Sequence, residues 1–242
     1  MSTSPPKQSS LPRNEAPSSD SALADHPAAI EALRETGAMF YQRGWSVGTS
    51  SNYSVITRHD PLELLVTASG KDKGRLAPHD FVLVNDRGQP VLPDQPKSSA
   101  ETLLHVVLAQ ELRVGAVLHT HSVWATLLSD YFAPQGGFGI EGYEMLKGLA
   151  GITTHETREW VEIFENSQDI PQLAEQVREA LVDPDRPVDH GYLIRRHGLY
   201  TWGTDLDEAR RHIEIFEFLF EVVARQLILT GELSSAAAAL ET

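Results

Sequence analysis

Apolar residues recur at a helical spacing near both ends of the chain. In the first of these segments, His26 to Gly44, the pattern predicts a helix that ends at the glycine. A longer helix is predicted from an N-cap at Asp205 to about Thr230. The predicted apolar face of this second helix consists of Phe216, Leu219, Phe220, Val223 and Leu227.

The middle of the chain alternates between short apolar runs and longer helical patterns. Strands are expected at 54–57, Leu62–Thr67, 81–84, 116–121 and 161–164. Helices are expected at 100–112, in the segment VWATLLSD, over one or two turns at 143–149, and at 170–182. The segment GYLIRRHGLYTWG predicts a hairpin around His197, and loops are expected at 48–54, 68–74 and 135–137. This alternation predicts an α/β domain with a central sheet and covering helices.

The first residues have a different composition from the rest of the chain. The stretch from Met1 to about Asp20 is rich in Ser and Pro and has almost no apolar residues. Such a segment buries too little surface to offset its ordering entropy, so residues 1–22 are predicted to be a disordered tail and 23–242 a single catalytic domain. The tail lacks the apolar region of a secretory signal, and no run approaches the roughly 20 apolar residues of a membrane span.

Charge and cysteine content narrow the functional classes. The formal net charge of −14 argues against nucleic-acid binding, which requires a basic face. A locally basic pocket for a small anion is still possible in an acidic protein. The chain has no cysteine, which excludes disulfides and thiolate metal sites and fits a reducing cytoplasm. Any metal site must therefore use His, Asp and Glu.

The pair His119 and His121 is the first candidate for such a site. Residues two apart in an extended segment face the same side, so both imidazoles can grip one metal ion. The spacing alone is weak evidence and favours two hydrogen-bonded polar side chains at a strand end. A third histidine, His197, and two candidate carboxylates, Glu101 and Glu144, favour the metal site. Three protein ligands with one open position is the arrangement of catalytic zinc.

Three loops of small residues form a second constellation. GTSSN, ASGKDKG and KSS combine Ser, Thr, Gly and Asn with Lys71, Lys73 and Lys97. Backbone amides, hydroxyl groups and a lysine make a natural phosphate cradle. The loops do not match the nucleotide-binding P-loop pattern, and each loop by itself fits an ordinary turn.

These segments together resemble the class II aldolase/adducin-like family. The similarity runs from about His26 to Leu229, and the segments that carry it are GTSSNYS, TASGKDKG, SS-x-E, LHTHS, EMLKG and RRHGLYTWG. The resemblance implies a three-layer α/β fold, with a central, mainly antiparallel sheet flanked by helices. It also implies a cytoplasmic homotetramer with active sites at subunit interfaces.

The same resemblance implies a chemistry. One Zn²⁺ per chain would be held by His119, His121 and His197, with Glu144 as catalytic acid–base and Glu101 as a second catalytic carboxylate beside the metal. The segment EMLKG is similar to that of dehydratases in the family, which implies zinc-dependent dehydration of 5-methylthioribulose 1-phosphate to 2,3-diketo-5-methylthiopentyl 1-phosphate in methionine salvage. The alternatives are a sugar-phosphate aldolase or epimerase that uses the same zinc enediolate, and a metal-free interaction module of the adducin type.

The resemblance also places the substrate phosphate. The implied contacts are Ser51, Asn52, Ser69, Gly70, Lys71 and Ser99. This chain has Ser51 where many relatives have Gly, and Ala68 and Ser98 where relatives often have Pro. For Glu144 to act as an acid near neutral pH its pKa must be raised, and we expect burial to raise it.

Overall fold

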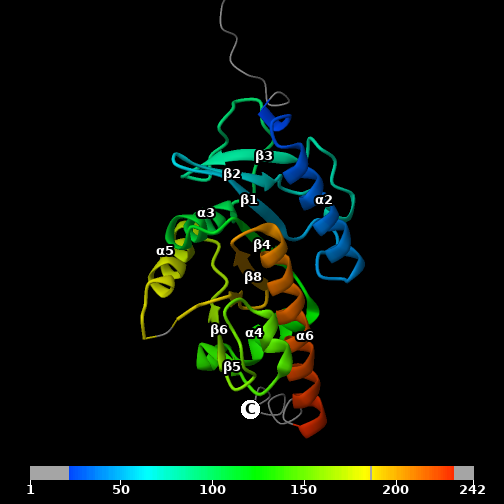
Figure 1. The fold of residues 1–242 in the computed structure, drawn as a ribbon, viewed down its shortest axis with the longest axis vertical. Coiled ribbons are helices and arrows are strands. Elements are labelled where there is room, and N and C mark those ends of the chain that lie inside the picture. Colours follow the sequence, from blue (N-terminus) through cyan, green and yellow to red (C-terminus); the bar gives the residue numbers. More distant parts are fainter. Residues whose placement is uncertain (1–21, 186, 232–242) are drawn as a thin grey trace, which may run out of the picture.

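An eight-stranded sheet runs through the middle of the molecule (Figure 1). This computed structural model describes residues 22–185 and 187–231. From one edge to the other the strands are β3 (Phe81–Asn85), β2 (Leu62–Thr67), β1 (Asn52–His59), β4 (Ala116–Thr120), β8 (Gly198–Gly203), β7 (Gly191–Ile194), β6 (Glu159–Phe164) and β5 (Gly137–Ile140). All neighbours pair antiparallel except β6 and β7, which are parallel. The predicted mainly antiparallel sheet is confirmed.

Helices cover both faces of the sheet and complete three layers (Figure 1). One face is covered by α2 (Pro27–Gln42), α4 (Val123–Tyr131) and α6 (Leu206–Thr230). The other face is covered by α3 (Thr102–Leu112) and α5 (Ile170–Leu181). The hairpin predicted around His197 is present as β7 and β8. Among the described residues, no helix is both long enough and apolar enough to span a membrane.

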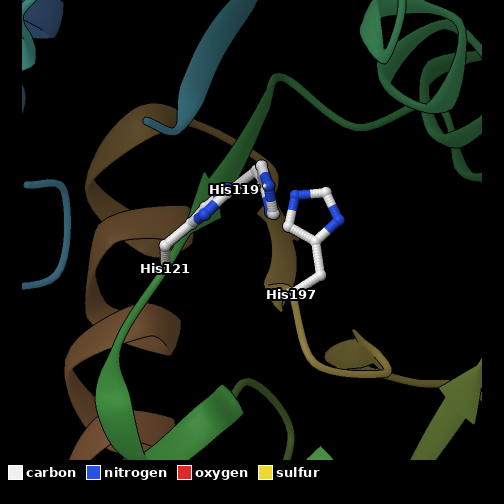
Figure 2. A group of neighbouring side chains, drawn as sticks. All are labelled: His119, His121 and His197. Atoms are coloured by element: carbon white, nitrogen blue, oxygen red, sulfur yellow. Dashed lines mark hydrogen bonds between the residues drawn. The ribbon is translucent and has the colours of Figure 1, made fainter. Parts of the chain in front are cut away.

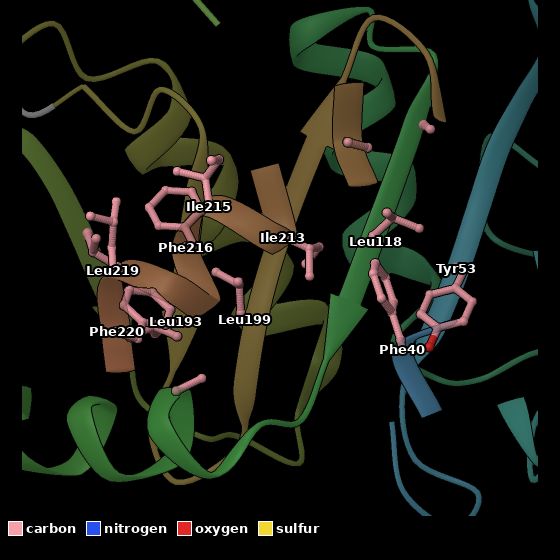
Figure 3. Close-up of a cluster of buried hydrophobic side chains, with 14 of the residues drawn as sticks. Phe40, Tyr53, Leu118, Leu193, Leu199, Ile213, Ile215, Phe216, Leu219 and Phe220 are labelled. Carbon is pink, nitrogen blue, oxygen red and sulfur yellow. The ribbon is translucent and has the colours of Figure 1, made fainter. Parts of the chain in front are cut away.

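The larger core lies between the sheet and α6. Asp205 caps this helix, because its carboxylate accepts a hydrogen bond of 2.8 Å from the Glu208 amide. Figure 3 shows the buried side chains Phe216, Leu219 and Phe220 packed toward strand residues of the sheet. The predicted apolar face of the terminal helix is therefore the face that anchors it.

Alternation along β4 decides on which side of the sheet the histidines lie. Leu118 belongs to the core under α6, whereas Val117 belongs to the core under α3 and α5. Successive side chains of a strand point to opposite faces, so His119 lies on the α3 and α5 side with Val117. Thr120 lies on the α6 side, where its hydroxyl contacts Glu217 of that helix at 3.4 Å.

Several boundaries differ from those predicted. The expected loop at 135–137 is instead the end of a 3₁₀ turn, η2 (Ala133–Gln135), followed directly by β5. Only glycine fits at the start of that strand, since a Cβ on Gly137 would lie 2.4 Å from the Val161 carbonyl oxygen. The helix expected from Ala100 begins two residues later, after a turn. The predicted disordered tail lies, except for Ala22, outside the described residues, and the division at residue 22 stays a prediction.

Candidate metal centre and its pocket

Three imidazole rings gather at one end of the neighbouring strands β4 and β8 (Figure 2). His119 lies in β4, His121 directly follows it, and His197 lies in the turn before β8. Their ligand-capable nitrogens are all within 4.8 Å of one another, and the Nε2 atoms of His119 and His121 are 2.8 Å apart. The structure thus brings together the three histidines that the sequence singled out, and we call this candidate site for an ion the metal centre.

Strand pairing explains how residues so far apart in sequence meet. In the register of the sheet, His119 stands opposite Asn52 of β1 on one side and opposite Tyr200 of β8 on the other. Gly198 permits the close approach of β8, because a Cβ there would lie 2.0 Å from the Thr120 carbonyl oxygen. Beyond the end of β4, the amide of His121 donates a 2.7 Å hydrogen bond to the Trp45 carbonyl and fixes the second ligand.

Burial leaves His119 and His121 neutral, and a hydrogen bond orients His119. Nδ1 of His119 donates to the Leu199 carbonyl at 2.9 Å, so Nε2 is the free nitrogen that faces the other rings. Burial lowers the pKa of His119 well below its usual value and that of His121 to about 4. Nδ1 of His197 is buried and forms no hydrogen bond within the described residues. Neutral imidazoles carry the lone pair that a metal needs.

A chain of hydrogen bonds holds a carboxylate against this centre. Ser54 contacts Nδ1 of His105 at 2.8 Å, and Nε2 of His105 contacts the side-chain oxygen of Asn52. The Asn52 amide nitrogen donates to Glu101 at 2.8 Å, so its oxygen must accept from His105. The other Glu101 oxygen lies 3.2 Å from Nε2 of His197. Burial lowers the pKa of His105 to about 3, which keeps this ring neutral. A neutral ring that donates from Nε2 must accept at Nδ1, so the hydrogen bonds from Ser54 to Glu101 have a fixed donor and acceptor order.

The donor set fits a metal ion such as zinc. Three imidazoles converge, one of them is oriented by a backbone carbonyl, and a carboxylate lies beside them. His121 and His197 also line a pocket, so the centre has an accessible side. This is the arrangement of a catalytic rather than a closed structural site.

The adjoining pocket has a volume of about 680 Å³ and is formed largely by the small-residue loops. Five of the predicted phosphate contacts line it together with the metal centre: Ser51, Asn52, Ser69, Gly70 and Ser99. Lys71, the sixth, is not among the lining residues, and its ammonium lies 2.7 Å from the Asp80 carboxylate. The lysine assigned to the phosphate is thus occupied elsewhere.

Other cations line the pocket instead. They are Lys73, Lys97 and Arg196, while Glu101 is the only acidic residue among the lining residues described. The pocket is therefore locally cationic in a protein with a formal net charge of −14. The sequence shows Lys71, Lys73 and Lys97 in or beside the small-residue loops but does not show which of them faces the pocket. That depends on the path of each folded loop.

Glu144 lies away from this pocket. It begins the 3₁₀ turn η3 (Glu144–Gly148), its side chain is 69% exposed, and it is not among the pocket-lining residues. A hydrogen bond from Lys147 and the nearby His155 lower its pKa below the usual value. The expectation that burial raises this pKa is therefore not met within a single chain.

The segment behind Glu144, up to Ala150, is nevertheless firmly held. Leu146 is fully buried, and the Ala150 amide donates to Nε2 of His212 at 3.1 Å. Nε2 of His190 donates to the Ala150 carbonyl at 2.7 Å, while its Nδ1 lies 3.0 Å from a Glu159 oxygen. Although burial lowers it, these hydrogen bonds raise the pKa of His190 overall. We call η3 together with 149–150 the Glu144 segment.

Comparisons with known proteins agree with this fold and site. Residues 31–224 match the family described as Class II Aldolase and Adducin N-terminal domain. Among solved structures, L-fuculose-1-phosphate aldolase from Thermus thermophilus superposes with a TM-score of 0.67 at 23% identity, over 84% of this chain and 98% of that one. YgbL from Escherichia coli, titled a putative aldolase/epimerase/decarboxylase, superposes with a TM-score of 0.65 at 24% identity, over 81% and 88%. The protein belongs to the class II aldolase/adducin family.

More similar relatives lie within one branch of that family. The methylthioribulose-1-phosphate dehydratase of Marinobacter nauticus is 48% identical over 198 residues, which cover 81% of this chain and 92% of the relative. The enzyme of the same name from Pseudomonas fluorescens is 50% identical over 192 residues, covering 79% and 89%.

Proposed function

We propose that this protein is a hydro-lyase that removes water from methylthioribulose 1-phosphate, a step of methionine salvage. One observation carries the proposal: three converging histidines open onto a cationic pocket of serine-rich loops, in a chain 48% identical to a dehydratase of that substrate. The histidines suit a metal that activates a carbonyl compound, and the loops suit a phosphate.

We assign one zinc ion per chain to His119, His121 and His197. When bound, zinc supplies Lewis-acid polarisation of the substrate carbonyl and so eases removal of the neighbouring proton. Glu101 is the second candidate catalytic carboxylate, because it lies beside His197 and is oriented by Asn52. The serine and glycine residues of the pocket loops hold the phosphate and fix the ketose relative to the metal centre.

Glu144 fits the proton transfers. Its lowered pKa leaves it ionised near neutral pH, ready to take the proton from carbon 3. The electron pair of that bond becomes the carbon 2–carbon 3 double bond of an enediolate. As the carbonyl re-forms, the double bond moves to carbons 3 and 4, and the carbon 4 hydroxyl leaves with the proton from Glu144 as water. Ketonisation of the resulting enol gives the 2,3-diketone.

The exposure of Glu144 suggests how it reaches a substrate. In the proposed homotetramer with interface active sites, the Glu144 segment of one copy meets the pocket of its neighbour. A firmly held segment that exposes its carboxylate is suited to such a contact. The lack of cysteine supports a cytoplasmic location.

The deciding experiment is a substrate assay with metal content recorded alongside. Purified protein is offered methylthioribulose 1-phosphate, and loss of water is followed against retro-aldol cleavage of pentulose and deoxyhexulose phosphates. We expect dehydration, and about one zinc per chain. Aldol cleavage without dehydration contradicts the proposal.

An aldolase or epimerase is the second candidate. Glu101 beside the metal centre favours it, because a carboxylate there can serve as the acid–base of an enediolate reaction without Glu144. An interaction module of the adducin type has no need for three convergent histidines, and zinc found in the purified protein would argue against it.

A further inference from the structure

The least expected group in the pocket is the ammonium of Lys73. This side chain is only 1% exposed, although lysine is among the residues least often buried. Removing a charge from water is costly unless partners replace the water. A methionine of similar shape would fill the same space at lower cost, so the buried charge calls for a functional explanation.

Lys73 is only partly provided with partners. Its ammonium donates one hydrogen bond of 2.7 Å, to the Lys71 carbonyl. Within residues 22–185 and 187–231 it forms no ion pair, and its two nearby carboxylates are committed elsewhere. Asp72 accepts from the Gly74 amide at 2.9 Å, and Asp80 lies 2.7 Å from the Lys71 ammonium. An ammonium has three donors, so most of this one's capacity remains for a ligand.

The position of Lys73 identifies that ligand as an anion. It lines the same pocket as Ser51, Ser69 and Gly70, and His121 and His197 line that pocket too. The Ser51 hydroxyl is buried in the same pocket with no hydrogen-bond partner among the described residues. A cation and a free hydroxyl on one wall complement a phosphate.

The other cations of the pocket are less suited to this task. Lys97 and Arg196 are exposed, and Arg196 lies 2.9 Å from the Asp130 carboxylate. Exposed charges are screened by water and salt, whereas a buried ammonium is not. Lys71 is paired with Asp80 outside the pocket lining.

We propose that Lys73, not Lys71, is the charged anchor for the phosphate of the substrate, binding it between the serine loops and the metal centre. This inference rests on the proposed function for the identity of the substrate, but not for the binding of a phosphate monoester. Lys73 is retained in the interior because the bound anion supplies the partner that the protein does not.

The test compares two lysines that are two positions apart. Glycerol 3-phosphate, a phosphate monoester without the ketone that the proposed reaction requires, is titrated into zinc-loaded protein by calorimetry. Lys73→Met and Lys73→Gln are expected to weaken binding roughly ten- to hundredfold, the range for losing a hydrogen bond to a charged group. The matched control Lys71→Met is expected to bind within about twofold of the unaltered protein.

Stability separates binding from a structural role. If Lys73 serves the ligand, Lys73→Met without phosphate melts at or above the temperature of the unaltered protein, because it removes a buried charge. Binding by both Lys73 variants within about twofold of the unaltered protein overturns the proposal. A lowered melting temperature with unchanged affinity of the folded protein overturns it too, in favour of a structural role. Failure to dehydrate methylthioribulose 1-phosphate leaves these binding results intact and counts against the proposed function alone.

Discussion

The metal centre and the Glu144 segment are built in opposite ways. The metal centre lies at the end of the central strands, with His119 fully buried and oriented by the Leu199 carbonyl, and with Glu101 held beside it by Asn52. The Glu144 segment is anchored equally well from behind, by His190 and His212, but its carboxylate is 69% exposed. The three histidines of the metal centre come together within a single chain, whereas the Glu144 segment holds its carboxylate toward the outside of the chain.

This difference teaches where each kind of catalytic group can be perturbed. Burial sets the protonation of His119 and His121, so their chemistry depends on packing inside the chain. The protonation of Glu144 is set by the surface partners Lys147 and His155, and in the proposed homotetramer a neighbouring copy that covers them would change it. The metal centre is therefore sensitive to changes in folding, whereas the proposal makes the Glu144 segment sensitive to assembly.

The largest effect is expected at the metal centre. His119→Ala removes the ligand oriented by the Leu199 carbonyl, so bound zinc is lost and turnover falls roughly a thousandfold or more. Metal analysis of the purified variant and the dehydration assay measure both effects. His79→Ala, at an exposed histidine outside the centre, serves as control. A metal-free, fully active His119→Ala enzyme contradicts the assignment.

A smaller loss is expected from Glu144→Gln, which separates chemistry from metal binding. The side chain is exposed and contacts only surface partners, so zinc content and melting temperature stay unchanged. Turnover falls roughly a hundred- to ten-thousandfold, the usual contribution of a general acid–base. The exposed neighbour Glu141→Gln is the matched control. Unchanged turnover in Glu144→Gln removes its catalytic role.

Mixing the two inactive variants tests whether the regions meet across an interface. Chains with His119→Ala supply an intact Glu144, and chains with Glu144→Gln supply an intact metal centre. When the two variants are co-expressed in equal amounts and assemble into closed rings, about a quarter of the interfaces combine an intact metal centre from one chain with an intact Glu144 from its neighbour. Recovered activity near that share supports a shared site. Co-expressed chains no more active than either parent place Glu144 and the metal centre in the same chain.

Acid is expected to destabilise the interior moderately. Burial lowers the pKa of His105 to about 3 and that of His212 to about 4, against about 6.5 unfolded. Because the unfolded chain binds these protons first, stability is complete above about pH 6.5 and falls as pH drops toward the folded values. At about pH 5.5 the free energy of unfolding falls by roughly 1 kcal/mol for each ring.

Urea unfolding at about pH 7.5 and about pH 5.5 measures this loss. His105→Gln is expected to make the dependence on pH shallower, whereas His59→Gln, at an exposed position on β1, leaves it unchanged. An unaltered slope in His105→Gln contradicts the assignment of a neutral buried ring.

The smallest effect concerns backbone strain. Ser51, on the pocket wall, has a φ of 71°, in the left-handed region that favours glycine. Beside the Glu144 segment the positive φ angles belong to Gly142 and Gly151. Ser51→Gly is therefore expected to raise the free energy of unfolding by up to about 1 kcal/mol in urea. Ser51→Ala retains the positive φ angle and is the control. If the free energy of unfolding of Ser51→Gly is no higher than that of Ser51→Ala, the backbone at this position is not strained.

Local pattern was enough for most of the fold. The apolar run before His119 and the hairpin expected around His197 predicted the strands that bring the three histidines together, and these strands are present. The short strand β5 was missed because its sequence, GFGI, contains two glycines and takes its pairing from β6. Edge strands of this kind are defined by their partner rather than by their own residues.

The candidate site was less predictable, because it depends on which groups meet across the sheet. The row formed by Asn52, His119 and Tyr200 follows from register, which periodicity does not supply. The same holds for Lys71 and Lys73. Lys71 pairs with Asp80 and Lys73 lines the pocket, and this difference depends on the path of one loop. Glu144 was identified by resemblance alone, and its exposure could not be read from its neighbours in sequence.

The route of the chain through the sheet has a consequence for how the protein is made. His119 and His121 leave the ribosome well before His197, and β5, β6, α5 and β7 are all synthesised in between. The three histidines therefore come together only after β8 has paired with β4, a contact between distant parts of the sequence that forms slowly. Loading of the proposed zinc would then follow closure of the sheet, because a nascent chain that ends before His197 offers an ion only two of the three ligands.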